Sequence, residues 1–169
     1  GLHDVVDVNH VPGTTDATIR PNQILAIGGL PEALLGGKKA QSVVELVEDR
    51  LLTPLGLRTL APGEPGYAPR YEGTLAQRDA AYHQGTVWAW LAGAFVDAWL
   101  RVHPDDPSAA RRIVEGLVAH LNEGCIGTVS EIFDAEAPHL PRGCLSQAWS
   151  VAEMLRVCLR LGEAWEGGL

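Results

Sequence analysis

The chain has 169 residues, the length of one domain or of part of a larger one. Hydrophobic residues make up 46% of it and charged residues 20%, which is typical of a soluble globular protein and excludes a disordered one. Its formal net charge of -8 argues against nucleic acid and anionic membranes as partners, because both require a basic surface. The charge is compatible with a neutral substrate.

Cysteine usage and the ends of the chain bear on its compartment. The cysteines at 125, 144 and 158 cannot all pair and match no metal-binding spacing, so we expect a reducing compartment, a cytoplasmic protein and no cofactor. No apolar run reaches the length of a membrane span, and no signal peptide opens the chain. The only methionine is Met154, so Gly1 is not a natural start, and we expect a processed or excerpted chain.

Hydrophobic periodicity predicts helices and no strands. After an opening with little periodicity, Pro21 begins a short apolar helix, 21–30. Residues 38–52 carry an apolar stripe opposite a charged face, as in a helix buried on one side. A long loop follows, of a length that is usually functional. Residues 86–102 are apolar nearly all round, which predicts a helix buried on every side.

The C-terminal part continues this alternation of buried and one-sided helices. Residues 109–121, which Ser108 can cap, form a one-sided helix, and 145–161 form a mostly buried one. Arg156 and Arg160 are interpreted as part of a solvated face of the last helix. Alternation of this kind is typical of concentric layers, in which outer helices surround inner ones.

A polar loop precedes each of the buried helices. If the inner helices run parallel, their N-termini meet at one end, where backbone N–H groups also point. The three loops would then line one pocket. The loop before 145–161 contains Glu131 and Asp134, among aromatic and apolar neighbours. Loops on rigid scaffolds concentrate binding and catalytic residues, although an ordinary solvated loop remains open on the residues alone.

Five segments occur in order along the chain: RPNQ, LLTPLGLRTL, YHQGTVWAWL, SEIFD and APHLPRGCLSQAWSVAE. They resemble the C-terminal glucosidase domain of glycogen debranching enzymes, the amylo-α-1,6-glucosidase unit, over about 7–161. The last two segments also resemble glucoamylases. The resemblance implies an all-α fold, an (α/α)6 toroid of alternating inner and outer helices. Residues 1–169, with about five helices, would be only the C-terminal portion of that domain.

The resemblance also implies an activity, the inverting hydrolysis of α-1,6-glucosidic branch linkages in glycogen or limit dextrin. Glu131 would be the general base acting on water. Asp134 is the rival carboxylate, and we interpret it as a structural or loop-capping acid. Inversion requires a second carboxyl group about 6.5–9.5 Å from the base. The family's general acid lies N-terminal of this chain, so we expect the isolated chain to be inactive. A base also needs hydrogen bonds, for which Ser130, Tyr82 and Arg142 are candidate donors.

Further residues of the loops are candidates for binding a glucan or oligosaccharide. The substrate-binding candidates are Arg20, Asn22, Gln23, Tyr82, His83, Gln84, Trp88 and Arg142. Alternatives remain: Arg20, Asn22 and Gln23 could cap the short helix, Arg20 could brace the loop of Glu131, Arg58 could have a similar role, and Trp88 could pack in the core. Trp90, Trp99 and Trp149 are assigned to core packing.

Three other interpretations remain, of which one changes only the substrate and two differ in class. The toroid could hydrolyse another α-glucoside or a trehalose-type sugar, or it could be a non-catalytic carbohydrate-binding or interaction module. A zinc-dependent toroid could instead bring Cys125, Cys144 and His83 together, because thiolates and imidazole suit zinc. The helices also show more apolar surface than so few of them can bury, which predicts self-association through the open edge of the incomplete ring.

Overall fold

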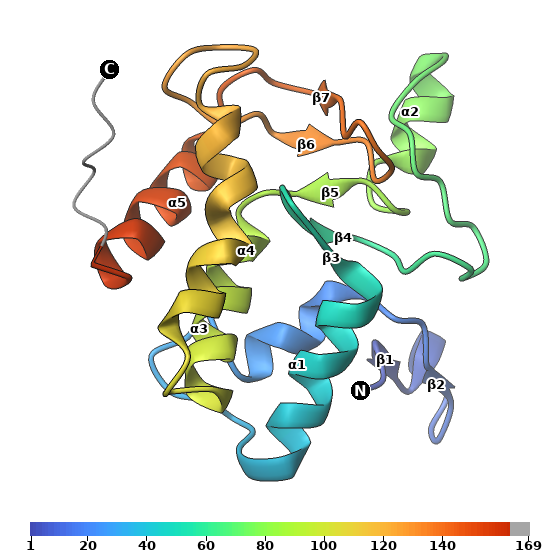
Figure 1. Cartoon of the computed structure of the whole chain (residues 1–169). Helices are drawn as coiled ribbons and strands as arrows, with labels where there is room; N and C mark the ends of the chain where they lie inside the picture. Colours follow the sequence, from blue (N-terminus) through green and yellow to red (C-terminus); the bar gives the residue numbers. More distant parts are fainter. Residues whose placement is uncertain (163–169) are drawn as a thin grey trace.

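The structure, a computed structural model, describes residues 1–162 and is mostly helical (Figure 1). Helix α3 (Leu91–Val102) lies at its centre. It packs against α1 (Gly37–Leu51), α4 (Pro107–His120), α5 (Ala148–Arg160) and the short 3-10 helix η2 (Pro21–Ala26). The helical nature of the fold is therefore as predicted.

The sequence of α3 explains its central position. Every residue from Leu91 to Ala98 is buried, as its nearly uniform apolar character predicted. Small side chains let neighbours approach closely: a Cβ added to Gly28 would lie 2.0 Å from the carbonyl oxygen of Ala94. The segment that follows η2 can therefore lie directly against the α3 backbone.

The prediction that the chain contains no strands is wrong for the described residues. A five-stranded antiparallel sheet has the order β3-β4-β5-β6-β7, and a separate hairpin pairs β1 with β2. The bounds in the large sheet are β3 (Leu52–Thr53), β4 (Gly56–Arg58), β5 (Val87–Trp88), β6 (Ile132–Phe133) and β7 (Pro141–Arg142), and those in the hairpin are β1 (Val5–Val6) and β2 (Thr15–Asp16). Strands of two or three residues are too short to show an alternating pattern, so periodicity could not reveal them.

The sheet also changes where the central helix begins. The segment predicted as a helix over 86–102 forms strand β5 first, because Trp88 pairs with Leu57 of β4 on one side and with Ile132 of β6 on the other. The helix starts only at Leu91. Trp88 is thus on a strand, while Trp90 is the N-cap residue of α3.

Other helix ends differ by a few residues. The predicted helix 21–30 is the shorter 3-10 helix η2, and 145–161 begins at Ala148. Asp106 rather than Ser108 caps α4, because its carboxylate accepts a hydrogen bond from the N–H of Ala109 at 2.9 Å.

A helix inside the long loop was not predicted. It is α2 (Leu75–Ala81), and it opens with a capping box between Thr74 and Gln77. The spacing of these two residues is the signal that could have revealed it.

The interpretation of Arg156 and Arg160 as a solvated face is incomplete, because both side chains are 39% exposed but also bind a buried acid. Both guanidinium groups pair with Asp97 of α3, which is only 4% exposed; the distance from Arg156 is 3.0 Å. A buried carboxylate requires partners, and α5 supplies them. Asp97 also accepts a hydrogen bond from the N–H of Gly29, at 3.3 Å. The charge therefore joins α5 and the segment after η2 to the central helix.

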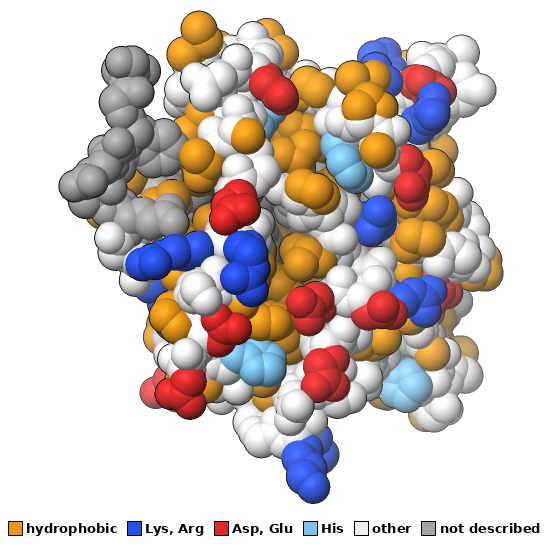
Figure 2. Space-filling model, in the orientation of Figure 1, with side chains coloured by type: hydrophobic (Ala, Val, Ile, Leu, Met, Phe, Trp, Pro, Cys, Tyr) orange, Lys and Arg blue, Asp and Glu red, His pale blue; other side chains and the backbone are white. Residues whose placement is uncertain are grey.

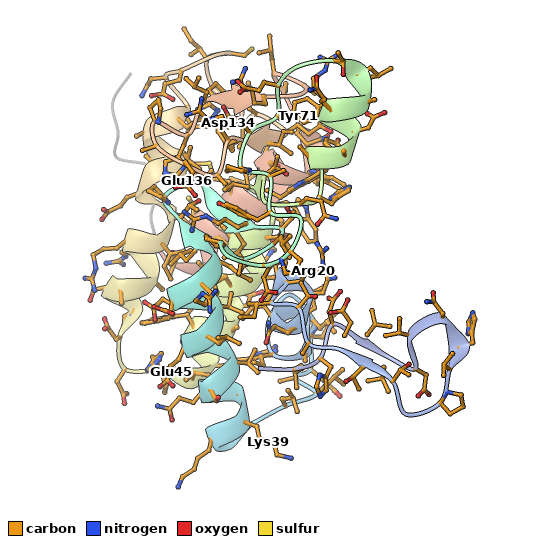
Figure 3. All side chains as sticks on the ribbon, turned by 90° about the vertical axis from the view of Figure 1, so that its right-hand side faces the viewer. Arg20, Lys39, Glu45, Tyr71, Asp134 and Glu136 are labelled. Atoms are coloured by element: carbon orange, nitrogen blue, oxygen red, sulfur yellow. The ribbon has the colours of Figure 1, made fainter. Side chains whose placement is uncertain are left out.

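The surface carries charges of both signs. Figure 2 shows acidic and basic side chains interspersed on one face, among patches of hydrophobic side chains. In Figure 3 the β1–β2 hairpin extends away from the body, and Lys39 and Glu45 lie along α1. Among residues 1–162, no helix is both long and apolar enough to span a membrane.

Candidate active site

A pocket of about 530 Å³ opens where three helices begin. For each of η2, α3 and α5, the N-cap residue and a residue of the first turn line it. Its lining consists of Arg20, Pro21, Asn22, Thr59, Tyr82, His83, Trp88, Trp90, Leu91, Glu131, Gln147 and Trp149. The prediction that the loops before the buried helices line one pocket is confirmed.

Glu131 is a half-buried carboxylate on the pocket wall, held from two sides. The hydroxyl of Tyr82 donates to its Oε1, and the backbone N–H of Cys144 donates to its Oε2 at 2.8 Å. The main chain is fixed too, because the N–H of Glu131 donates to the carbonyl of Cys144 at 2.9 Å. Donors from two separate loops therefore define the orientation of this carboxylate.

The turn that supplies the second donor requires glycine. Gly143 has a φ of +68°, a conformation that residues with a Cβ rarely adopt. A Cβ at this position would also lie 2.3 Å from Oε2 of Glu131. The glycine thus lets the backbone approach the carboxylate closely enough to donate to it.

The hydroxyl of Tyr82 stays protonated and can therefore keep donating its hydrogen bond to Glu131. Its pKa is raised by burial first and by the hydrogen bond and charge of Glu131 second, so the hydroxyl keeps its proton. Its carbonyl accepts from the Trp88 indole at 3.2 Å and from the Thr86 hydroxyl at 2.7 Å. These bonds tie the end of α2 to strand β5.

Arg20 lines the pocket but is mainly engaged with the surrounding loops. Its guanidinium donates to the carbonyls of Thr59 and His83, at 3.1 and 2.8 Å, and to the side chain of Gln84, at 2.8 Å. A longer ion pair of 3.5 Å joins it to Asp4. Arg20 therefore links the loop before η2 to the loop before α3 and to Thr59, which follows β4, and its described bonds do not reach the loop of Glu131.

His83 and Trp88 form a stacked pair on the pocket wall, with ring centroids 4.9 Å apart and planes inclined by 16°. Burial, and then the charge of Arg20, lower the pKa of His83. A lowered pKa favours the neutral imidazole, which has one donor and one acceptor nitrogen for a hydroxyl group.

Two tryptophans assigned to core packing, Trp90 and Trp149, line the pocket, and Trp90 also packs against the main core as predicted. Trp149 is 49% exposed and lies in the first turn of α5, with its ring centroid 5.6 Å from that of Trp90 and 5.9 Å from that of Trp88. The three indoles form one aromatic wall. The late start of α5 explains the misassignment, since the predicted helix placed Trp149 well inside a buried element. Trp99, by contrast, packs against the main core as expected.

Three predicted binding residues lie outside the pocket lining. Gln23 is buried and bonds to the main chain of Leu2 and Arg20, both at 3.0 Å. The Gln84 side chain accepts from Arg20, as described above. Arg142 donates to the Asp134 carboxylate at 2.8 and 3.0 Å, and its pKa is raised chiefly by that bond. The structure brings none of the three onto the pocket wall.

Asp134 has a structural environment, as interpreted from the sequence. It is 5% exposed, and besides Arg142 it accepts from the N–H of Tyr71 at 2.9 Å. Figure 3 shows Asp134 and Tyr71 close together, away from Arg20. Arg58 also braces loops, since it donates to the carbonyls of Leu52 and Ala135.

Sequence reasoning missed Thr59 and Gln147. The hydroxyl of Thr59 donates to the carbonyl of Thr86 and accepts from the N–H of Gly85, so this residue also fixes the loop before α3. Gln147 is the N-cap residue of α5. Its place just before a buried helix was the available signal, the same one that identified Arg20.

The zinc alternative has no donor set in the described part of the chain. No group of three or more His, Cys, Asp or Glu side chains able to hold a metal ion occurs within residues 1–162. Within the described residues Cys125 and Cys144 are exposed and Cys158 is buried, and none of the three forms a disulfide.

Together, fold and site define a mostly helical domain whose helix N-termini surround an aromatic pocket with an anchored carboxylate. The sequence model described as amylo-alpha-1,6-glucosidase matches residues 2–156, and the chain belongs to this family. It is also similar to the glycogen debranching enzyme of Saccharomyces cerevisiae, with 28% identity over 89% of the chain. The chain spans only 11% of the length of that relative. The resemblance found in the sequence is confirmed.

Proposed function

We propose that residues 1–169 are the C-terminal portion of an α/α-toroid glycosidase domain that hydrolyses α-1,6-glucosidic branch linkages of glycogen or limit dextrin. Membership of the amylo-alpha-1,6-glucosidase family supports the reaction, and the name of the yeast relative supports the substrate. The observation that carries the proposal is the placement of Glu131. It is the one carboxylate among the lining residues of the pocket, and donors on two loops fix it there.

Glu131 acts as the general base in this proposal. A water molecule attacks the anomeric carbon from the face opposite the leaving group, and Glu131 takes its proton. The bond to the leaving oxygen breaks, and a general acid from outside this chain protonates that oxygen. Attack from the opposite face inverts the configuration, so the first product is the β-anomer of glucose.

The remaining lining residues bind the sugar. Indole rings present flat apolar faces of the kind that cover the C–H face of a sugar ring, and Trp88, Trp90 and Trp149 form such a wall. Asn22, His83 and Gln147 offer donors and acceptors for hydroxyl groups. A pocket of this composition is suited to a neutral glucan and agrees with the acidic net charge of the chain.

The test uses the complete enzyme and a branched limit dextrin. Proton NMR during the first turnovers should show β-glucose before mutarotation, and initial α-glucose would contradict inversion. A chain restricted to residues 1–169 should release no glucose, because Glu131 has no partner acid. Release of glucose by that chain would place the acid within these residues, with Asp79 and Asp134 the first to replace.

Self-association is a further part of the proposal, and it rests on α5. Leu145, Trp149, Leu155 and Leu159, on or just before this helix, are 49–68% exposed. Contiguous apolar surface of this kind is rare on soluble monomers. We expect the isolated chain to form dimers or larger species at micromolar concentration in light scattering. Replacing Leu155 and Leu159 by Glu should return it to a monomer, whereas a wild-type monomer would contradict the proposal.

A further inference from the structure

A buried histidine lies behind the pocket wall, and the proposed reaction does not use it. His120 ends helix α4 and is 2% exposed. Its ring meets Phe133 of β6 edge to face, with centroids 4.7 Å apart. A buried imidazole is costly unless its two nitrogens have partners, so the identity of those partners indicates its role.

Both nitrogens of His120 have partners, and one partner adjoins the proposed base. Nε2 accepts a hydrogen bond from the backbone N–H of Ser130, at 3.3 Å, and lies 3.2 Å from the Ser130 hydroxyl. Nδ1 lies 3.0 Å from a carboxylate oxygen of Glu123. Since a backbone N–H can only donate, Nε2 is the unprotonated nitrogen, and Nδ1 carries the proton that it donates to Glu123.

The segment 128–131 is attached to the following loop along its other side. The Thr128 hydroxyl lies 2.6 Å from that of Ser146, and the carbonyl of Val129 accepts from the N–H of Gln147 at 2.9 Å. Glu131 bonds to Cys144 as described above. All of these bonds lead to the loop that enters α5, whereas His120 connects the segment to the long helix α4.

We propose that His120 is a positioning residue for Glu131: as the neutral imidazole protonated at Nδ1, it accepts the N–H of Ser130 and fixes the backbone from which the Glu131 carboxylate extends. This inference rests on the proposed function, because it assigns Glu131 the role of base. His120 does not line the pocket. Its replacement therefore lowers kcat and leaves KM nearly unchanged.

Two substitutions of similar polarity separate the two sides of the ring. In His120→Gln the amide oxygen reaches the place of Nε2 and can accept from Ser130. In His120→Asn the shorter amide reaches only the place of Nδ1, toward Glu123. Ser130→Ala is the matched control, because it removes the hydroxyl and keeps the backbone N–H.

The experiment measures kcat and KM for glucose release by the complete enzyme, with amide hydrogen exchange over residues 129–133. A displaced base costs up to about 100-fold in rate, so His120→Asn should lower kcat by about 10–100-fold with KM within about twofold. His120→Gln and Ser130→Ala should stay within about fivefold of the wild type. Exchange at Ser130 should be faster in the Asn variant than in the Gln variant.

The opposite pattern overturns the inference. If the Asn variant keeps the wild-type kcat, or if the Gln variant loses as much as the Asn variant, the bond to Ser130 does not position the base. Failure of the proposed function has a different signature: the wild type releases no glucose, or Glu131→Gln remains fully active. In that case the exchange rates alone decide, and equal rates in the Asn and Gln variants refute the positioning role.

Discussion

The two carboxylates at the ends of strand β6 lie in contrasting surroundings, although only Ile132 and Phe133 separate them. Successive side chains of a strand point to opposite faces, so residues 131 and 134 leave the strand on different sides. Glu131 lines the pocket between a phenol and a backbone N–H. Asp134 is buried against the guanidinium of Arg142. Asp134 is thus paired with a charged guanidinium group. Glu131, the proposed base, is held by uncharged donors, the Tyr82 hydroxyl and the Cys144 N–H.

The largest effect on turnover is expected when the charge of Glu131 is removed. Glu131→Gln should lower kcat of the complete enzyme by about 10²–10⁴-fold, since general base catalysis contributes about that much. KM and the free energy of unfolding should change little, because the amide oxygen still accepts from Cys144 or Tyr82. Glu115→Gln, on the exposed face of α4, is the control. Near-normal turnover would remove Glu131 as the base.

Asp134→Asn should give the converse result, a loss of stability rather than of chemistry. The change leaves Arg142 without its closest charged partner, and hydrogen bonds to charged groups contribute about 1.5–3 kcal/mol. Chemical denaturation should therefore show a free energy of unfolding lower by about that amount. If turnover of the folded variant fell as far as that of Glu131→Gln, the two acids would share the chemistry and the contrast would be lost.

Trp149 tests whether the exposed wall of the pocket binds substrate. Trp149→Ala should raise KM by about two- to tenfold, because stacking contributes about 0.5–1.5 kcal/mol. The half-exposed indole contributes little to the core, so thermal stability should hardly change. Leu159→Ala, an exposed apolar residue of the same helix outside the pocket lining, provides the comparison. Equal KM values for the two variants would return Trp149 to a packing role.

The smallest expected effect concerns the two tyrosines that donate to carboxylates. Burial, and then Glu136, raise the pKa of Tyr67 to about 12, and the pKa of Tyr82 is raised beside Glu131. A raised pKa means that the folded protein holds the proton more tightly than the unfolded chain. The resulting stability is therefore present below pH 10 and is lost as pH rises from about 10 toward 12.

Unfolding titrations between pH 9 and 12 should show this decline. The decline should be smaller in Tyr67→Phe, which removes the titrating group beside Glu136, and smaller again in Tyr67→Phe/Tyr82→Phe. An unchanged slope in the double variant would assign the decline to other groups.

The sequence predicted the helices and the convergence of their N-termini because both follow from long apolar patterns. The apolar run around Phe95 is unmistakable, and the polar residues before η2, α3 and α5 mark the pocket. Glu131 stood out because it lies in the SEIFD segment, which resembles a family motif. The membership of the chain in that family is confirmed. Its role as base remains a prediction.

What the sequence could not predict depends on contacts between distant residues. Pairing of Trp88 with Leu57 and Ile132 converts the predicted start of a helix into a strand. Arg142 pairs with Ile132 in the sheet register, between the two acids, and its side chain reaches Asp134; no local pattern shows which of the two acids is its partner. Trp149 lines the pocket because α5 begins only at Ala148, and the sequence did not predict this start.

The five-stranded sheet has a consequence for how the molecule acquires its site. Its ladder joins Leu57 to Trp88 and Trp88 to Ile132, so two of its connections close over long stretches of chain, whereas each helix needs only local contacts. Closing long loops costs entropy before the contacts repay it, and non-local pairing slows folding. Refolding should therefore restore far-ultraviolet circular dichroism before the Trp149 fluorescence of the assembled pocket. The proposed base reaches its place only when the slowest contacts have formed.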